Sequence, residues 1–379
     1  MNDGNSLQER LVDSIRSENI SDVKECIDMG AIESHDSSFG GIGKICPLHE
    51  AVKVKSYDLI NILVSHGADI NETTFGRETA LSIASLKLKD PKLVRYLVEM
   101  GADVNTRYLN GPLVAHLSYH ASIEGKFPLC SEQLEILEYL IQSGFNRKSK
   151  SGDCPNSLYE GPIEAGDIPA LEVLFRNKIS RNQPSTFRAF RKAVIDGNVE
   201  VVEYLLNNRF KTMPTKKQEG YPYDLIYQAV GSGSLEMVKL FIKHGSSLER
   251  VITNGGVRDP LVFKAVKNKT SDILELLIAS GAPVDDVGAV VCKESNANTI
   301  HYHTALMLAS SLNDCESIQL LLNAGANINR VCSYGKANFD RDPVFENVSA
   351  LDMANRVQAK QAIDLLISFG GESESALRT

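Results

Sequence analysis

The stretch TALMLASSLNDCESIQLLLNAGANIN occupies residues 304–329. Its ending, LLNAGANIN, is repeated with small changes as LVSHGADIN at 63–71 and as LVEMGADVN at 97–105. Within the stretch, Ile318, Leu321 and Leu322 have the i, i+3, i+4 spacing that gives a helix one apolar face. Gly325 follows, and a glycine there lets the chain leave the helix through the left-handed region. A short sequence motif that recurs several times predicts a repeat protein.

The apolar triplet and its closing residue recur in ten units, and eight of the ten close on glycine. The other nine units are Val23/Cys26/Ile27 with Gly30, Ile60/Leu63/Val64 with Gly67, Val94/Leu97/Val98 with Gly101, Leu137/Leu140/Ile141 with Gly144, Leu171/Leu174/Phe175 with Lys178, Val202/Leu205/Leu206 with Arg209, Val238/Phe241/Ile242 with Gly245, Leu274/Leu277/Ile278 with Gly281, and Ile363/Leu366/Ile367 with Gly370. An alanine upstream marks a second short helix in many units, at Ala51, Ala84, Ala193, Ala229, Ala265, Ala309 and Ala354. Because neither helix can bury its apolar face alone, we expect helix–turn–helix units that stack on one another.

The turn that precedes the first helix is also repeated. It reads CPLHEAV from Cys46, TALSIAS from Thr79, TALMLAS from Thr304 and SALDMAN from Ser349. These stretches resemble the T-P-L-H-x-A signature of the ankyrin repeat family, and HGADIN, MGADVN and AGANIN resemble its ending. The resemblance covers about residues 6–371. It is strongest at 46–71, 79–105 and 304–329, whereas the repeats within 112–210 follow mainly the spacing.

This resemblance implies an all-α fold, an ankyrin-repeat solenoid of stacked helix–turn–helix units with projecting β-hairpin-like finger loops. It implies a single elongated array over residues 1–379. We expect an insertion at 118–132, between the two helices of the fourth repeat. Long fingers are expected at 34–45, 210–223, 283–301 and 330–348. A solenoid tolerates such loops because they project from one edge and disturb no shared core.

Composition narrows the class of protein. Lys and Arg number 40 and Asp and Glu 48, which gives a net charge of −8 and argues against a general nucleic-acid binder. The beginning, MNDGNSLQER, lacks the apolar core of a secretory signal, and no stretch approaches the roughly 18 apolar residues that span a bilayer. The seven cysteines form no CxxC pair, which favours a reducing compartment. We therefore expect a cytoplasmic protein that binds no nucleic acid, no membrane and no small-molecule substrate. If the protein is a microbial or viral effector, we expect it in the cytosol of the host cell.

Two groups of residues are candidates for a metal site. His116, His120 and Glu124 lie four apart and would share one helix face, but the metalloprotease pattern needs Glu where Leu117 stands. Cys292, His301, His303 and Cys315 form a second group, and their spacing matches no standard zinc module. A solvated helix face and ordinary repeat positions are the preferred interpretations. We expect no metal, no cofactor and no catalytic residue.

Three further features have structural interpretations that we prefer. His49 in PLHEA is expected to form a hydrogen bond in the turn that starts its helix. The stretch FGGIGK at 39–44 does not match G-x-x-x-x-G-K-[ST], the pattern of a phosphate-binding loop, so we interpret it as a finger loop. The basic runs at 147–152 and 210–218 read as solvated loops, with contact to an acidic partner as the alternative.

Three asparagines end their repeats, at Asn71, Asn105 and Asn329, each with a leucine eight residues earlier. In the ankyrin family this resembles the pattern hydroxylated by an asparaginyl oxygenase. The preferred alternative is a loop asparagine that binds its own backbone.

The resemblance also implies where a partner binds: a concave face lined by the first helices and the fingers. Aromatic and arginine side chains are enriched at binding hot spots. The finger candidates are Phe75, Arg77, Tyr108, Tyr221, Tyr223, Tyr302, Tyr334, Phe339 and Arg341. Variable slots on the first helices hold Lys53, Leu86, Ile195, Lys267 and Ser311. The longest aromatic-bearing fingers follow repeats six, eight and nine, so we expect the interface in the C-terminal half, unless these aromatics pack against their own loops.

We therefore predict a non-catalytic protein–protein interaction scaffold or adaptor. One alternative is a microbial or viral ankyrin effector that acts on a host protein, because the central repeats and the fingers are irregular. A further alternative is an enzyme or metal-binding protein whose site lies in an insertion.

Overall fold

The computed structural model describes residues 3–31, 45–74, 77–109, 111–123, 128–145, 158–180, 184–209, 225–249, 252–253, 256–257, 259–294, 297–336 and 344–377. The chain forms two compact segments, Met1–Phe190 and Arg191–Thr379. The expectation of a single array over residues 1–379 therefore stays a prediction.

Each of the ten repeats forms a pair of helices, as predicted. The first helices are α1 (Asp3–Arg16), α3 (Pro47–Lys53), α5 (Ala80–Ser82) continued by η1 (Ile83–Leu88), α7 (Leu113–Ile123), α9 (Glu160–Ala165), α11 (Pro184–Ile195), α13 (Leu225–Ser232), α15 (Leu261–Asn268), α17 (Ala305–Ser311) and α19 (Ala350–Arg356). The second helices are α2 (Ile20–Asp28), α4 (Tyr57–Ser65), α6 (Pro91–Glu99), α8 (Ser131–Gln142), α10 (Ile168–Arg176), α12 (Val199–Asn207), α14 (Leu235–Lys243), α16 (Ser271–Ala279), α18 (Cys315–Asn323) and α20 (Lys360–Ser368). A short helix, α21 (Glu374–Leu377), follows.

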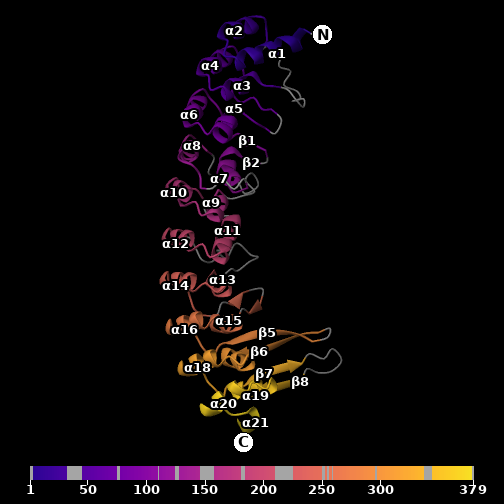
Figure 1. The fold of residues 1–379 in the computed structure, drawn as a ribbon, viewed down its shortest axis with the longest axis vertical. Helices are drawn as coiled ribbons and strands as arrows, with labels where there is room; N and C mark the ends of the chain where they lie inside the picture. Colours follow the sequence, from indigo (N-terminus) through magenta and orange to yellow (C-terminus); the bar gives the residue numbers. More distant parts are fainter. Residues whose placement is uncertain are drawn as a thin grey trace. The chain divides into compact units, whose positions relative to one another are not determined.

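Within each segment, like helices stack on like. In the C-terminal segment α13 contacts α15, α15 contacts α17 and α17 contacts α19, while α14, α16, α18 and α20 form a parallel row. Figure 1 shows the first helices on the side that carries the strand pairs and the second helices on the other side. The predicted triplets supply the core, since Ile60, Leu63, Ile318 and Leu321 are all fully buried. This is the ankyrin-type solenoid architecture that the sequence predicts.

Every repeat closes in the left-handed conformation, including the two that lack glycine. Gly325 has φ +84°, while Lys178 and Arg209 have φ values of 55° and 58°. The geometry of the repeat therefore imposes the left-handed conformation whichever residue stands there. A residue other than glycine adopts it at a free-energy cost of about 1–2 kcal/mol.

The first helix of repeat 3 contains a π-helical turn, which the repeat spacing did not predict. One residue more separates Thr79 from Leu93 than separates Cys46 from Leu59. The extra residue is accommodated as η1 (Ile83–Leu88), which ends in a left-handed Lys89. A one-residue insertion in an α-helix commonly forms such a π-bulge.

The structure describes part of the predicted insertion of repeat 4 at 118–132, and some of its residues are helical. Residues 118–123 continue α7, and residues 131–132 begin α8. α8 has 12 residues where α4 and α18 have nine, so it gains one turn. The buried Asp167 accepts a hydrogen bond from the Leu129 backbone N–H at 2.7 Å and thereby ties the insertion to repeat 5.

Within the described residues, four antiparallel strand pairs lie between repeats. They are β1 (Arg107–Tyr108) with β2 (Gly111–Pro112), β3 (Ile252–Thr253) with β4 (Gly256–Val257), β5 (Val287–Glu294) with β6 (Ala297–Thr304), and β7 (Cys332–Lys336) with β8 (Val344–Val348). The last two pairs are hairpins in the regions of the predicted fingers 283–301 and 330–348, and β6 continues past the first of these to Thr304. β6 lies beside β7, so the two fingers are neighbours. The predicted fingers 34–45 and 210–223 lie outside the described residues, apart from Ile45.

Candidate partner-binding surface

The first helices present a row of exposed or half-exposed residues, each two positions after the small buried residue of its repeat. Lys53 follows the fully buried Ala51 in this way, and Lys267 follows the fully buried Ala265. We call this set the inner-helix row; it consists of Arg16, Lys53, Leu86, Glu164, Ile195, Gly231, Lys267, Ser311 and Arg356. The small residue lets the next helix approach closely, while the row residue two positions later is exposed or half-exposed. The core is therefore similar from repeat to repeat, while the row changes in charge and size.

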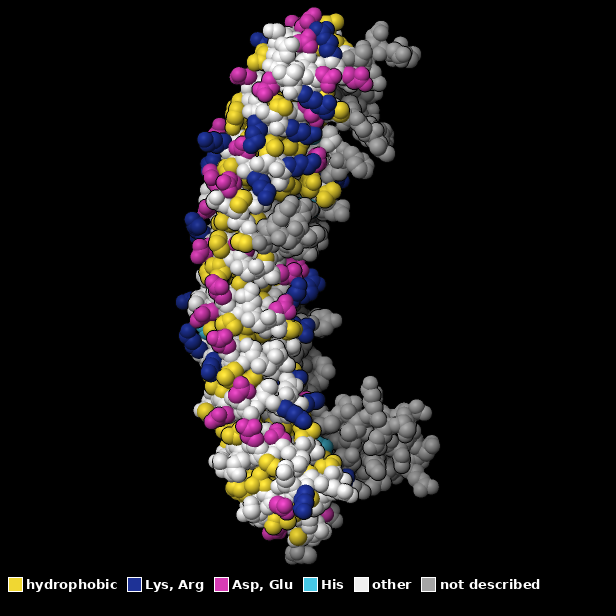
Figure 2. Space-filling view, viewed as in Figure 1, with side chains coloured by type: hydrophobic (Ala, Val, Ile, Leu, Met, Phe, Trp, Pro, Cys, Tyr) yellow, Lys and Arg dark blue, Asp and Glu magenta, His cyan; other side chains and the backbone are white. Residues whose placement is uncertain are grey.

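Two of the predicted partner-binding lysines belong to local ion pairs. The buried carboxylate of Glu50 accepts from Arg16 Nε at 3.0 Å and from Lys53 Nζ at 2.7 Å. Burial raises the pKa of Glu50, but the hydrogen bonds from Lys53 and Arg16 outweigh it and leave that pKa below its usual value. Lys267 Nζ lies 3.5 Å from Asp259. Figure 2 shows the same intermingling on the visible face of the first repeats, where Lys and Arg side chains alternate with Asp and Glu.

Arg77 and Tyr108 are the finger candidates whose side chains the structure describes. Arg77 is exposed, on a backbone with φ 61°. Tyr108 is half-buried, and its ring makes an edge-to-face contact with His116 at a centroid distance of 5.2 Å. Tyr108 thus packs against helix α7 of the next repeat. A partner-binding role for either residue stays a prediction.

The other finger candidates are placed only in part. Tyr302 lies in β6 opposite Ala289, and Tyr334 lies in β7 opposite Glu346, both by backbone register alone. Phe75, Tyr221, Tyr223, Phe339 and Arg341 lie outside the described residues.

The base of the β5–β6 finger is fixed against the preceding repeat. Gly288 pairs with His303 across the hairpin, and its backbone lies against the buried ring of Phe263. A Cβ added at Gly288 would come within 2.5 Å of that ring. Only glycine allows this approach, so the finger leaves the repeat at a defined place.

His49 forms its hydrogen bond in a different place from the one predicted. Its Nε2 lies 3.2 Å from the backbone carbonyl of Glu72, in the closing loop, and not in the turn that starts α3. Burial lowers the pKa of His49, which favours the neutral ring. The side chain therefore ties the start of a repeat to its end.

The side chains of the repeat-ending asparagines form hydrogen bonds to the next repeat. The Asn71 side chain accepts from the Asp103 N–H at 2.8 Å and donates to the Gly101 carbonyl at 3.4 Å. The Asn329 side chain accepts from the Glu372 N–H at 2.9 Å and donates to the Gly370 carbonyl at 3.5 Å. Asn105 donates to the Gly144 carbonyl at 3.2 Å, and Asp285, at the same position, accepts from the Asn327 N–H at 3.0 Å. These residues are inter-repeat fasteners, and their hydroxylation stays a prediction.

The two candidate metal groups are described only in part. His116 contacts Tyr108, whereas Glu124 and the side chain of His120 lie outside the described residues. His303 is buried at the base of the β5–β6 finger and Cys315 begins α18, while the side chains of Cys292 and His301 are outside the description. Among the side chains that are described, no three His, Cys, Asp or Glu residues are grouped to hold a metal ion. The FGGIGK stretch and both basic runs also lie outside the described residues.

Comparison with known proteins decides the family. The family described as ankyrin repeats (three copies) matches residues 13–108, 190–288 and 226–332, which is more than half of the chain. The chain belongs to the ankyrin repeat family. Ankyrin repeats are generally protein–protein interaction modules and are typically non-catalytic.

Three curated relatives show how far the similarity extends. Alpha-latrotoxin-Lg1a of Latrodectus geometricus is 27% identical over 129 residues, 33% of this ankyrin chain and 9% of that protein. A probable E3 ubiquitin-protein ligase of Oryza sativa subsp. japonica is 22% identical over 240 residues, 61% of this chain and 44% of that protein. A putative ankyrin repeat protein of Acanthamoeba polyphaga mimivirus is 24% identical over 194 residues, 51% of this chain and 46% of that protein. The chain spans less than half the length of each.

In the part of the chain that the structure describes, no helix has both the length and the apolar character that crossing a bilayer requires.

Proposed function

We propose that this ankyrin chain is a non-catalytic scaffold or adaptor that binds a partner protein through the inner-helix row and the fingers. The observation that supports it is the contrast between constant core and variable row. Ala51, Ala193 and Ala265 are buried in the same place, while the row residues two positions later are Lys53, Ile195 and Lys267. A surface that varies on a fixed, already folded framework suits selective binding, because little conformational entropy is lost on association.

The row can be tested against a matched set of surface positions. Lys53→Glu, Ile195→Asp and Lys267→Glu are compared with Lys92→Glu and Lys239→Glu, which lie on the second helices α6 and α14. Partners captured from the native cell type are identified by mass spectrometry and then measured with purified components. Row variants are expected to weaken binding about tenfold or more, and second-helix variants much less. Equal loss from both sets would contradict an interface on the first helices.

The fingers are tested separately. Replacing Tyr221, Tyr223 and Tyr334 together by Ala is expected to weaken partner binding with helical content unchanged by circular dichroism. Full binding by this variant would move the interface away from these fingers.

A second candidate function is a microbial or viral ankyrin effector that acts on a host protein. The mimivirus protein, similar over 51% of the chain, is the observation that favours it. In both cases we propose a cytoplasmic location, in the host cytosol for an effector. Comparing partners captured from host and non-host lysates distinguishes the two, since an effector is expected to select a host protein.

An enzyme or metal-binding role remains the third proposal, carried by His116, His120 and Glu124. Metal analysis of the purified protein tests it directly. Stoichiometric zinc or iron that is lost in a His116→Ala variant would replace the scaffold proposal with this one.

A further inference from the structure

The inner-helix row contains one residue without a side chain, Gly231 on α13. The helix does not require glycine there, because the φ angle of Gly231 lies outside the left-handed region, and alanine would favour the helix by about 1 kcal/mol. Among the described residues beyond its own helix, a Cβ at Gly231 would meet only Lys264, at 3.4 Å from Cε, which is an ordinary contact. Neither the backbone nor the packing therefore explains the missing side chain, which leaves an opening in the row beside Lys264.

The ammonium group of Lys264 lies at this opening. Lys264 belongs to α15 of the next repeat, which packs against α13. Its Nζ lies 5.3 Å from the ring centroid of Tyr227, within the range of a cation–π contact, and 3.9 Å from the place of a Gly231 Cβ. The side chain is half-exposed, and no described residue accepts a hydrogen bond from Nζ or forms an ion pair with it. Tyr227 and Gly231 thus place a cation at the surface whose N–H groups are available to a ligand.

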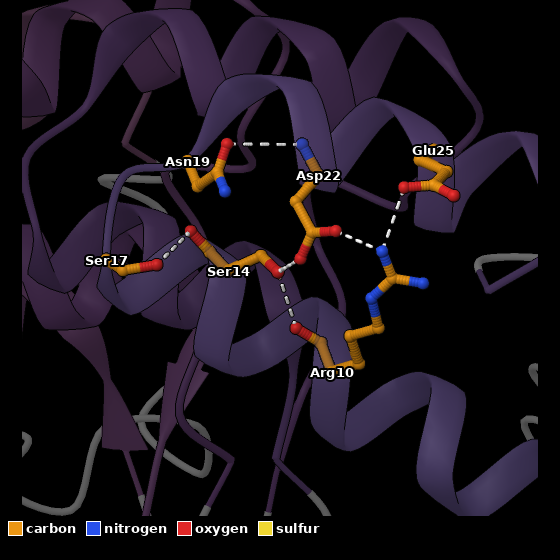
Figure 3. Close-up of polar contacts among 6 residues, drawn as sticks. All are labelled: Arg10, Ser14, Ser17, Asn19, Asp22 and Glu25. Carbon is orange, nitrogen blue, oxygen red and sulfur yellow. Dashed lines mark hydrogen bonds and ion pairs between the residues drawn. The ribbon is translucent and has the colours of Figure 1, made fainter.

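The charges of repeat 1 show the opposite arrangement (Figure 3). Arg10 forms an ion pair with Asp22 and a second with Glu25 at 2.8 Å. The Ser14 hydroxyl contacts the Asp22 carboxylate as well as the Arg10 carbonyl. The hydrogen bonds from Ser14 and Arg10 hold the pKa of Asp22 below its usual value. Groups that pair with one another in this way have little charge left for a ligand, in contrast to Lys264.

The first helices beside the opening carry positive charge only. α13 contains no charged residue, and the charged residues of α15 are Lys264 and Lys267. Because three positions separate these lysines, they lie on one face of the helix. Asp259, just before α15, lies 3.5 Å from Lys267 Nζ and leaves 46% of the Lys267 side chain exposed. Lys267 therefore adds a second accessible positive charge next to Lys264.

The other acidic side chains of repeats 7 and 8 that the structure describes lie on the second helices or in the loops that follow them. They are Glu236, Glu249, Asp272, Glu275, Asp285 and Asp286. None of them forms an ion pair with Lys264 or Lys267, and Figure 1 shows the second helices on the other side from the first. In repeat 6, Arg191 and Lys192 lie near the end of α11, and the exposed Asp196 follows it. Within the described residues, the first helices of these repeats are thus basic, although the whole chain has a net charge of −8.

We propose that Lys264 and Lys267 bind an acidic side chain of the partner protein, which enters the row at Gly231. The carboxylate accepts a charge-assisted hydrogen bond from Lys264 Nζ, and Lys267 contributes the second positive charge. This inference rests on the proposed function and adds the chemistry of the partner, an acidic segment that lies along the first helices of repeats 7 and 8.

Binding of a fluorescein-labelled hexaglutamate peptide to the full chain, measured by anisotropy at low ionic strength, tests the charge of the ligand. The wild type is expected to bind hexaglutamate more tightly than hexaglutamine, and added salt is expected to weaken the binding of hexaglutamate. Lys264→Gln is expected to raise the dissociation constant about three- to tenfold, as the loss of a half-exposed ion pair with a charge-assisted hydrogen bond does. Lys239→Gln on the second helix α14 is the matched control, and we expect it to have little effect.

Filling the opening is the second test. Gly231→Leu is expected to raise the dissociation constant for hexaglutamate about threefold or more without lowering thermal stability, because leucine favours a helix more than glycine does. Gly231→Ala adds a side chain that fits beside Lys264, so it keeps the test valid if leucine disturbs the fold. It is expected to weaken binding by less than leucine.

Several outcomes overturn the proposal. They are equal binding of hexaglutamate and hexaglutamine, equal effects of Lys264→Gln and Lys239→Gln, and unchanged binding by both Gly231 variants. Tighter binding of an oligothymidylate of the same length than of hexaglutamate also overturns it, because the site would then prefer nucleic acid. A captured partner that depends on Lys53 and Ile195 but not on Lys264 would reject this site and keep the scaffold function.

Discussion

The π-helical turn in repeat 3 leads to a prediction about one buried hydroxyl. Ser85 and Ser310 occupy the same place in their repeats, one residue after Ala84 and Ala309, and both are fully buried. In the regular α17, the Ser310 hydroxyl donates to the Leu306 carbonyl at 2.7 Å. In η1 the chain has a different pitch, and within the described part of the chain the Ser85 hydroxyl has no hydrogen-bond partner.

Replacing each serine by alanine should therefore have different results. Ser310→Ala loses a hydrogen bond of about 1 kcal/mol and gains about 0.5 kcal/mol of helix propensity, so its net effect is small and destabilising. Ser85→Ala removes a buried polar group that costs about 1–3 kcal/mol when it is unpaired, and it gains the same propensity. We expect Ser85→Ala to stabilise repeat 3 by about 1.5–3.5 kcal/mol.

Hydrogen exchange measured by mass spectrometry is the suitable assay, because a repeat array opens locally as well as globally. Peptides covering residues 80–97 report repeat 3, and peptides covering 305–323 report repeat 9. Slower exchange in the first set of Ser85→Ala, with little change or faster exchange in the second set of Ser310→Ala, is the expected outcome. If Ser85→Ala speeds exchange as much as Ser310→Ala, the hydroxyl has a partner and the reasoning about η1 is wrong.

Three further predictions concern the core, the fasteners and pH. Leu321→Ala is expected to destabilise repeat 9 by about 2–5 kcal/mol in urea unfolding, since its side chain is fully buried; an unchanged midpoint would refute the register of the repeat. Asn71→Ala is expected to loosen the junction of repeats 2 and 3 by about 1–2 kcal/mol, and Asn71→Asp by less, because Asp285 shows that a carboxylate keeps the acceptor bond; equal effects would contradict the role of the Asp103 N–H. The pKa values of Glu50 and His49 are both lowered in the folded protein. The stability that each group contributes is therefore complete above its unfolded pKa, and it is lost as pH falls through its folded pKa. Because histidine has the higher pKa, the contribution of His49 is lost first and that of Glu50 second. Glu50→Gln and His49→Gln should each flatten this acid limb of thermal stability, and wild-type slopes in both variants would assign the limb to other groups.

The repeat architecture follows from the sequence because its signals are local. Ile318, Leu321 and Gly325 lie in one helix and the loop that follows it. The same spacing identifies the buried residues of the other repeats. Counting residues between Thr79 and Leu93 would also have revealed the extra residue of η1, which the shared spacing of the triplets concealed.

The polar contacts depend on distances that the sequence does not contain. His49 binds Glu72 at the far end of its repeat, and Asn71 binds residues 30 and 32 positions ahead. Such partners become visible only when repeats are stacked. Tyr108 shows the same limit at the surface. An aromatic residue in a finger can bind a partner or pack against the protein itself, and the sequence does not distinguish the two.

The asparagine fasteners have a mechanical consequence. Each one crosses a single junction, and because junctions in series all carry the same force, a pull along the array opens the weakest junction first. Where Asn71 and Asn329 stand, two hydrogen bonds share the load, while in repeat 7 the corresponding position holds Glu249. Under tension the chain should therefore lengthen in unequal steps, with the fastened junctions yielding last.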